Sequence, residues 1–152
     1  EVYTVDMEAQ RPTYADFDGQ FEMIGVDLWT PQQVCAGDEV QVSMTWQVTN
    51  QPERYYNTFL QLLTPDQTTR LAGIDAQPHS DRPTVEWGVQ GMLNLGDVLT
   101  LTVPVDAEPR RYLLVNGFYD VETSERLPVF GADGSRLPGD YALLSEVEVV
   151  GC

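Results

Sequence analysis

His79 is the only histidine of the chain and the residue best suited by type to acid–base catalysis. It lies in a proline-flanked loop, and the acids that could orient it are Asp75 and Asp81. A hydrolase or transferase needs a nucleophile, a base and an orienting group, and the chain has no Gly-x-Ser-x-Gly turn to present a serine. We therefore expect a solvated loop histidine, no catalytic residue and no enzyme activity in this domain.

The 24 acidic residues offer two other chemistries, glycoside hydrolysis and cation binding. Hydrolysis needs two carboxylates held across a sugar, and in so acidic a chain such pairs arise by chance. Calcium is the more open case, because Asp16, Asp18 and Asp133 stand in Asp-Gly turns where carboxylate and carbonyl oxygens gather. Asp and Gly are also common turn residues. A structural calcium ion and plain turns both stay open, and we expect no other cofactor.

Aromatic residues are the candidates for ligand binding, because exposed rings stack on sugars while polar neighbours bond the hydroxyl groups. The candidates are Trp87, Tyr55, Tyr56, Tyr119 and Trp29. If residues 55 and 56 lie in a strand, their side chains point to opposite faces, so one of the two tyrosines belongs to the core. Trp87 suits a plug for its long loop as well as a stacking platform.

The two cysteines, Cys35 and Cys152, stand far apart in the sequence. A disulfide between them would close a loop of more than 100 residues and would suit an oxidising compartment. Two unrelated free thiols are the alternative, because sequence alone does not show whether the two segments meet. One histidine and two distant cysteines are a poor ligand set for zinc.

Charge and hydropathy exclude two classes of partner. The formal charge is -16, and all eight basic residues are arginine, so nucleic acid and anionic lipid headgroups should be repelled. No apolar run approaches the roughly 18 residues of a membrane span, so we expect no direct membrane insertion. The chain does not start with methionine and shows no leader, so we expect an excised domain or processed product of a larger parent.

Alternation with a period of two dominates the hydrophobic pattern. It is clearest over residues 40–48, where Trp46 takes a core position. Further strands are expected over 21–28 with a bulge at Gly25, and over 55–63, 70–74, 99–105, 112–119, 127–130 and 146–150. Residues 75–91 are expected to form a long loop.

Turns recur about every ten residues, which favours an all-β fold over a parallel α/β sheet. Tyr112, just after Pro109, occupies the place of a tyrosine corner. We predict an immunoglobulin-like antiparallel β-sandwich with seven to nine strands over residues 17–152, preceded by an arm or linker over residues 1–16.

Four short motifs carry a family resemblance: Gly25-Val26-Asp27-Leu28, Ala36-Gly37-Asp38, Thr45-Trp46-Gln47 and Gly117-Phe118-Tyr119-Asp120. In this order they resemble the C-terminal extracytoplasmic β-sandwich domain of bacterial membrane glycosyltransferases similar to dolichyl-phosphate-mannose protein mannosyltransferases. The resemblance covers residues 17–150. These motifs are turn and core signatures, so they identify a fold better than a chemistry.

The resemblance implies a non-catalytic accessory domain outside the cytoplasmic membrane, at the cell surface or in the periplasm. Its partners would be the membrane-embedded catalytic part of the same chain and an acceptor glycan or protein. The alternative is a purely structural immunoglobulin-like spacer or protein-interaction module of a cell-surface protein. The sequence departs from the family in its cysteines and at Gln61, which bears on no known activity.

Overall fold

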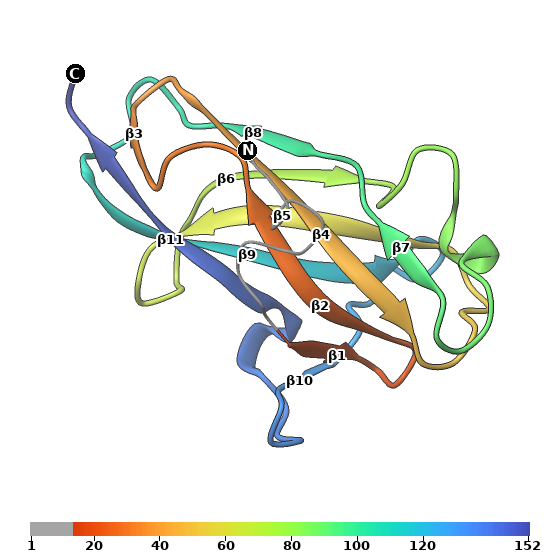
Figure 1. The fold of residues 1–152 in the computed structure, drawn as a ribbon. Coiled ribbons are helices and arrows are strands. Elements are labelled where there is room, and N and C mark those ends of the chain that lie inside the picture. The colour runs from red at the N-terminus through yellow and green to blue at the C-terminus, as the bar shows by residue number, and fades with distance from the viewer. Residues whose placement is uncertain (1–13) are drawn as a thin grey trace.

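Strand β4 (Glu39–Val48) shows how the sequence builds this fold. Its even-numbered residues from Val40 to Val48 are buried, and the odd-numbered residues between them are half-buried on the opposite face. Strict alternation of this kind gives a strand one core face and one outer face. The computed structural model describes residues 14–152, in which two sheets pack face to face with their core faces inward (Figure 1).

The two sheets have six and five strands. The six-stranded sheet has the order β10 (Val129–Phe130), β1 (Ala15–Phe17), β2 (Phe21–Leu28), β4 and β7 (Leu93–Leu95), and β8 (Leu99–Thr102) also pairs with β4. The five-stranded sheet has the order β3 (Gln33–Cys35), β11 (Ala142–Val150), β9 (Arg110–Asp120), β5 (Tyr56–Leu63) and β6 (Arg70–Ala76). Two short 3-10 helices, η2 (Thr84–Glu86) and η3 (Pro138–Asp140), lie in the connections.

This architecture confirms the predicted all-β sandwich and corrects its details. The described residues form eleven strands, more than the seven to nine expected, because β1, β3 and β7 have three residues each and are too short to show a period. All pairs are antiparallel except β3 with β11, which is parallel. The expected arm lies mainly outside the described residues, but Ala15 and Asp16 belong to β1 and therefore to the sandwich.

Aromatic rings fill the centre of the core. Trp46 stacks on Trp87 with ring centroids 5.3 Å apart, and the edge of Phe21 meets Trp87 at 4.9 Å. Phe118 packs edge-on against Phe17 and Trp46. These rings come from both sheets and from the long loop, so they bind the layers together through large buried areas and favourable ring geometry.

Two predicted local features are present. The register between β2 and β4 shifts between Met23 and Gly25, which is the bulge expected there. Tyr112 donates a hydrogen bond from its hydroxyl to the carbonyl oxygen of Glu108, 2.8 Å away, which is the contact that defines a tyrosine corner.

A disulfide joins the two distant cysteines. Cys35 ends β3 and is bonded to Cys152, with their Cα atoms 5.7 Å apart and a sequence separation of 117. The parallel pairing of β3 with β11, which sets Cys35 opposite Val150, brings them together. In the described part of the chain, no helix is long and apolar enough to cross a membrane.

Candidate functional site

Trp87 and Tyr56 lie in the core, which corrects their candidacy as ligand-contacting residues. Trp87 has no exposed surface, and its indole nitrogen donates to the carbonyl oxygen of Arg82 at 3.2 Å. It follows η2, whose turn directs the ring inward, so it plugs the long loop. Tyr56 is only 5 % exposed. Neither ring offers a face on which a sugar can stack.

Tyr55 and Tyr119 lie together on the outer face of the five-stranded sheet. Tyr55 is exposed and its carbonyl oxygen accepts from the backbone N–H of Val121. Tyr119 pairs with Asn57 in the sheet register, and its hydroxyl donates to Asp75 at 3.2 Å. We call this surface, made of Tyr55, Asn57, Asp75 and Tyr119, the tyrosine face. Its polar groups bond largely to one another.

Two of the three aspartates proposed as calcium ligands accept hydrogen bonds within turns, and Asp18 takes a positive φ of 54° in the turn after β1. Asp16 accepts from the backbone N–H of Gly19 at 2.9 Å. Asp133 accepts from the hydroxyl and backbone N–H of Ser135, which lowers the pKa of the Asp133 carboxyl. Within residues 14–152, no three side chains of His, Cys, Asp or Glu gather as a metal site. Calcium binding at these turns stays a prediction, tested by thermal unfolding with calcium and with a chelator.

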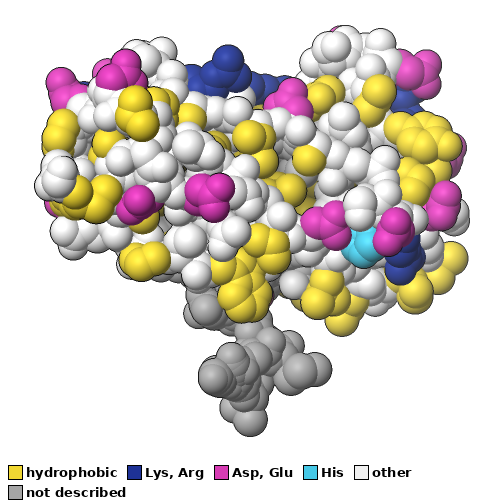
Figure 2. All heavy atoms as spheres, turned by 90° about the horizontal axis from the view of Figure 1, so that it is seen from above, with side chains coloured by type: hydrophobic (Ala, Val, Ile, Leu, Met, Phe, Trp, Pro, Cys, Tyr) yellow, Lys and Arg dark blue, Asp and Glu magenta, His cyan; other side chains and the backbone are white. Residues whose placement is uncertain are grey.

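His79 is held in its loop by local contacts. Its Nδ1 accepts from the backbone N–H of Asp81 at 3.1 Å, and its Nε2 lies 4.0 Å from a carboxylate oxygen of Asp97. The other carboxylate oxygen of Asp97 accepts from the backbone N–H of Ser80. Figure 2 shows the histidine among acidic side chains at the surface. Among the described residues, no nucleophilic side chain hydrogen-bonds the imidazole, so the arrangement ties a loop together and lacks the constellation of a hydrolase.

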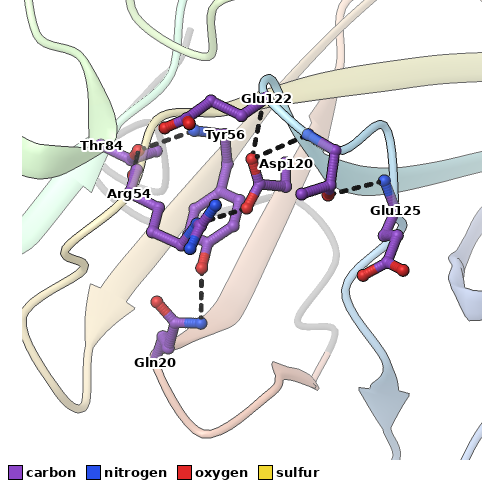
Figure 3. Close-up of polar contacts among 8 residues, drawn as sticks. Gln20, Arg54, Tyr56, Thr84, Asp120, Glu122 and Glu125 are labelled. Carbon is purple, nitrogen blue, oxygen red and sulfur yellow. Dashed lines mark hydrogen bonds and ion pairs between the residues drawn. The ribbon is translucent and has the colours of Figure 1, made fainter.

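The loops at one end of the sandwich converge on Asp120. Arg54 lies 2.5 Å from one carboxylate oxygen of Asp120, and the backbone N–H of Glu122 donates to the other at 2.8 Å (Figure 3). Burial raises the pKa of the Asp120 carboxyl, but these hydrogen bonds and the arginine charge outweigh it and lower the pKa. Two clefts of about 250 and 470 Å³ adjoin this pair, and Arg54 and Tyr56 line both.

Hydrogen bonds at this end of the sandwich connect separate loops. Tyr56 accepts from Gln20 at 3.0 Å through its hydroxyl, and its backbone N–H donates to Thr84. Thr84 in turn donates to the carbonyl oxygen of Arg54 at 2.6 Å. Because Arg54 pairs with Asp120, and Tyr56 is bonded to Gln20 and Thr84, this end acts first as a clamp between the β4–β5, β9–β10 and long loops.

A different surface has the composition of a sugar-binding site. Three neighbouring strands present uncharged side chains on the outer face of the sheet. These are the outward-facing residues of β4 from 41 to 47, those of β7, and Thr100 of β8. We call this surface the neutral stripe; it consists of Gln41, Ser43, Thr45, Gln47, Leu93, Leu95 and Thr100. A charge-free area of amides, hydroxyls and leucines is notable in a chain of charge -16.

Trp29 lies beside the neutral stripe with a fixed ring. Its side chain is 53 % exposed, and its indole nitrogen donates to the hydroxyl of Ser43 at 2.9 Å. Its backbone N–H donates to the carbonyl oxygen of Gln41 at 2.8 Å. Just before β1, the hydroxyl of Tyr14 donates to Glu22 at 2.7 Å, which raises the pKa of Tyr14 to about 12. Sequence reasoning named Trp29 among the aromatics but missed the stripe, which combines three strands.

Comparisons with known proteins show the fold alone. No family model matches the chain, and no curated protein matches it. Among solved structures, the crystal structure of the C-terminal domain of Wzt matches with a TM-score of 0.60 and 16 % sequence identity, over 100 % of this chain and 88 % of that chain. The chain therefore shares a β-sandwich fold with a C-terminal domain of another protein. The comparisons give no link to a mannosyltransferase, and that part of the resemblance stays a prediction.

Proposed function

We propose that this chain is a non-catalytic accessory domain that binds a neutral glycan on the outer face of its six-stranded sheet. The observation that carries the proposal is the exposed Trp29 ring, fixed by Ser43 beside the neutral stripe. Stacking on an aromatic face and hydrogen bonds to planar amides and hydroxyls are the interactions that sugars form with proteins. A ring that is already oriented loses little conformational freedom on binding.

The charge distribution supports an uncharged ligand. Acidic residues border the stripe at Glu22, Asp27 and Glu39, which pair with Gln47, Ser43 and Thr102. These carboxylates would repel an anionic glycan at the rim of the site, while the stripe itself has no charged group to be stripped of water. A chain of neutral sugars lying along β4 therefore fits this surface best.

The setting of the domain follows from the same proposal. The motif resemblance favours a place outside the cytoplasmic membrane, attached to a membrane glycosyltransferase whose acceptor the domain would hold. The disulfide between Cys35 and Cys152 supports an oxidising compartment. A weak individual contact would suffice, because tethering to a membrane protein raises the effective concentration of the ligand.

The test is a glycan array probed with the purified chain and two variants, Trp29→Ala and Tyr55→Ala. Both variants remove one exposed aromatic ring, so they are matched in chemistry, but Tyr55 belongs to the tyrosine face. We expect reproducible binding of neutral glycans that falls at least about tenfold in Trp29→Ala and is unchanged in Tyr55→Ala.

Other outcomes separate the site from the function. Loss of binding in Tyr55→Ala alone would keep a glycan-binding domain but move the site to the tyrosine face. No binding by a folded sample would reject glycan recognition and favour a structural spacer or protein-interaction module. Circular dichroism of each variant establishes that the fold is retained.

A further inference from the structure

The outer face of the five-stranded sheet already holds one arginine side chain of this protein. Phe59 of β5 points to this face, since its neighbour Leu60 belongs to the core. The guanidinium carbon of Arg126 lies 4.3 Å from the centroid of the Phe59 ring, within the roughly 6 Å of a cation–π contact. The same guanidinium donates to the carbonyl oxygen of Gly139 at 2.9 Å. An aromatic ring and an oxygen acceptor together thus bind an arginine here.

Tyr119 and Asp75 repeat this combination on the tyrosine face. Tyr119 of β9 pairs with Asn57 of β5, two positions before Phe59, and its hydroxyl donates to Oδ2 of Asp75 at 3.2 Å. Asp75 belongs to β6, which lies on the other side of β5 (Figure 1). Within residues 14–152, no basic side chain forms a cation–π contact with Tyr119 or an ion pair with Asp75. The ring and the acceptor are present together without a cation.

Both groups can accept a further partner. Asp75 is exposed, and the Tyr119 hydroxyl occupies one of the roughly four acceptor positions that a carboxylate offers. A guanidinium on the ring of Tyr119 can therefore bond Asp75 without displacing the tyrosine. Tyr55 extends the surface, because its carbonyl oxygen accepts from Val121 and makes it the diagonal neighbour of Tyr119 across β5 and β9. Its side chain is 55 % exposed.

Charge decides which kind of partner suits this surface. A chain of charge -16 attracts cations and repels anions. Arginine is favoured over lysine, because its planar guanidinium stacks on aromatic rings and sheds water more readily than an ammonium group.

We propose that the tyrosine face docks a basic segment of a partner polypeptide, with an arginine guanidinium stacked on Tyr119 and bonded to Asp75, and with Tyr55 against the adjoining part of the segment. The tyrosine face belongs to the five-stranded sheet and the neutral stripe to the six-stranded sheet. This docking therefore does not depend on glycan binding.

The experiment titrates the whole chain with three short glycine–serine peptides and follows its backbone amide NMR signals. The peptides carry two central arginines, two lysines or two citrullines; citrulline has nearly the shape of arginine without its charge. We expect the arginine peptide to bind about threefold to fivefold more tightly than the lysine peptide, and the citrulline peptide not to bind. The signals of Asn57 and Tyr119 should shift, while Thr45 on the other sheet stays constant.

Matched variants separate the ring from the charge. Tyr119→Leu should weaken binding of the arginine peptide about fivefold, whereas Tyr119→Phe keeps the ring and should retain binding. Asp75→Asn should weaken it about tenfold, and Asp106→Asn, which removes one exposed carboxylate elsewhere, less than about twofold. Tyr55→Leu, at an exposed ring, should cost about threefold and keeps the test valid if Tyr119→Leu fails to fold.

Three results would overturn the proposal. Equal binding of the arginine and lysine peptides, with equal losses in Asp75→Asn and Asp106→Asn, would mean attraction by net charge alone. No binding of any peptide would mean that the face docks no basic segment. Glucosamine is the third probe; if it shifts the signals of Asn57 and Tyr119 and the arginine peptide does not, the ligand is an amino sugar instead of a polypeptide. Glycan binding through Trp29 is measured separately on the array.

Discussion

Cys35 and Cys152 are bonded to each other across 117 positions of sequence because β3 runs parallel to β11 at the edge of the five-stranded sheet. The bond attaches a three-residue edge strand and the last residue of the chain to the sandwich. It also holds the crossover from β2 to β3 near the edge of the sheet, where the backbone N–H of Glu148 donates to the carbonyl oxygen of Gln32 at 2.7 Å.

Removal of this disulfide should lower the stability of the fold. Closing so long a loop restricts the unfolded chain, so Cys35→Ser should reduce the free energy of unfolding by about 4 kcal/mol. Urea unfolding with and without a reducing agent measures this change. The reducing agent should have no further effect on the variant. Equal stability of the native chain in both conditions would contradict the prediction.

Trp87 should matter for stability, not for ligand contact. Its ring is fully buried and packs against Trp46 and Phe21, so Trp87→Ala should cost about 3–5 kcal/mol of unfolding free energy. Trp29→Ala, at a half-exposed ring, should cost less than about 1 kcal/mol. Chemical denaturation of both variants tests the contrast, and similar costs for the two would show that the burial of Trp87 is misassigned.

Gly117 is required by a close approach of two chain segments. A Cβ atom at this position would overlap the ring of Phe59 and lie 2.9 Å from the carbonyl oxygen of Asp140. Gly117→Ala should therefore lower the free energy of unfolding by about 1–3 kcal/mol. Gly131→Ala is the matched control, because the nearest atoms to its Cβ lie at 3.5 Å; it should be neutral or slightly stabilising. An equal effect of the two substitutions would argue against the Phe59 contact.

Asp120 should contribute to stability in a pH-dependent way. Burial raises its pKa, but the Glu122 N–H and the Arg54 guanidinium lower it below the ordinary value of 3.8. A carboxyl with a lowered pKa in the folded state stabilises the fold fully above about pH 4, and this contribution is lost as the pH falls toward the folded pKa. Asp120→Asn should therefore flatten the fall of Tm below pH 4.

The control for this pH dependence is Asp106→Asn, which changes an exposed carboxyl that takes no part in the contacts of Asp120. Thermal unfolding of the native chain and both variants between pH 2 and pH 6 provides the comparison. A profile for Asp120→Asn that is parallel to that of the native chain would show that the contact with Arg54 and Glu122 does not couple to folding.

Local sequence patterns were sufficient to predict features that depend on a single strand or on near neighbours. The alternation of residues 40–48 predicted β4 and the burial of Trp46, and a single glycine predicted the bulge in β2. Tyr112 was predicted from its position after Pro109, because a tyrosine corner needs only a hydroxyl and a carbonyl four residues upstream. Each of these features depends on contacts between near neighbours or on one strand's period.

The ligand surfaces could be predicted only in part. Trp29 and Tyr55 were named as aromatic candidates, and both are exposed. The burial of Trp87 was left open, since a loop residue has no period that assigns it to a face. The neutral stripe escaped sequence reasoning because its residues come from β4, β7 and β8 and become neighbours only through the register of the sheet.

By itself, the sequence determined an all-β sandwich and the core face of β4, because these depend on residue types and a period of two. The tertiary structure alone decided which distant residues meet. It joined Cys35 to Cys152, set Trp29 beside Ser43, and placed Ser145 against Gln32. Such contacts depend on strand order and register across both sheets, and these follow from the packing of the whole core.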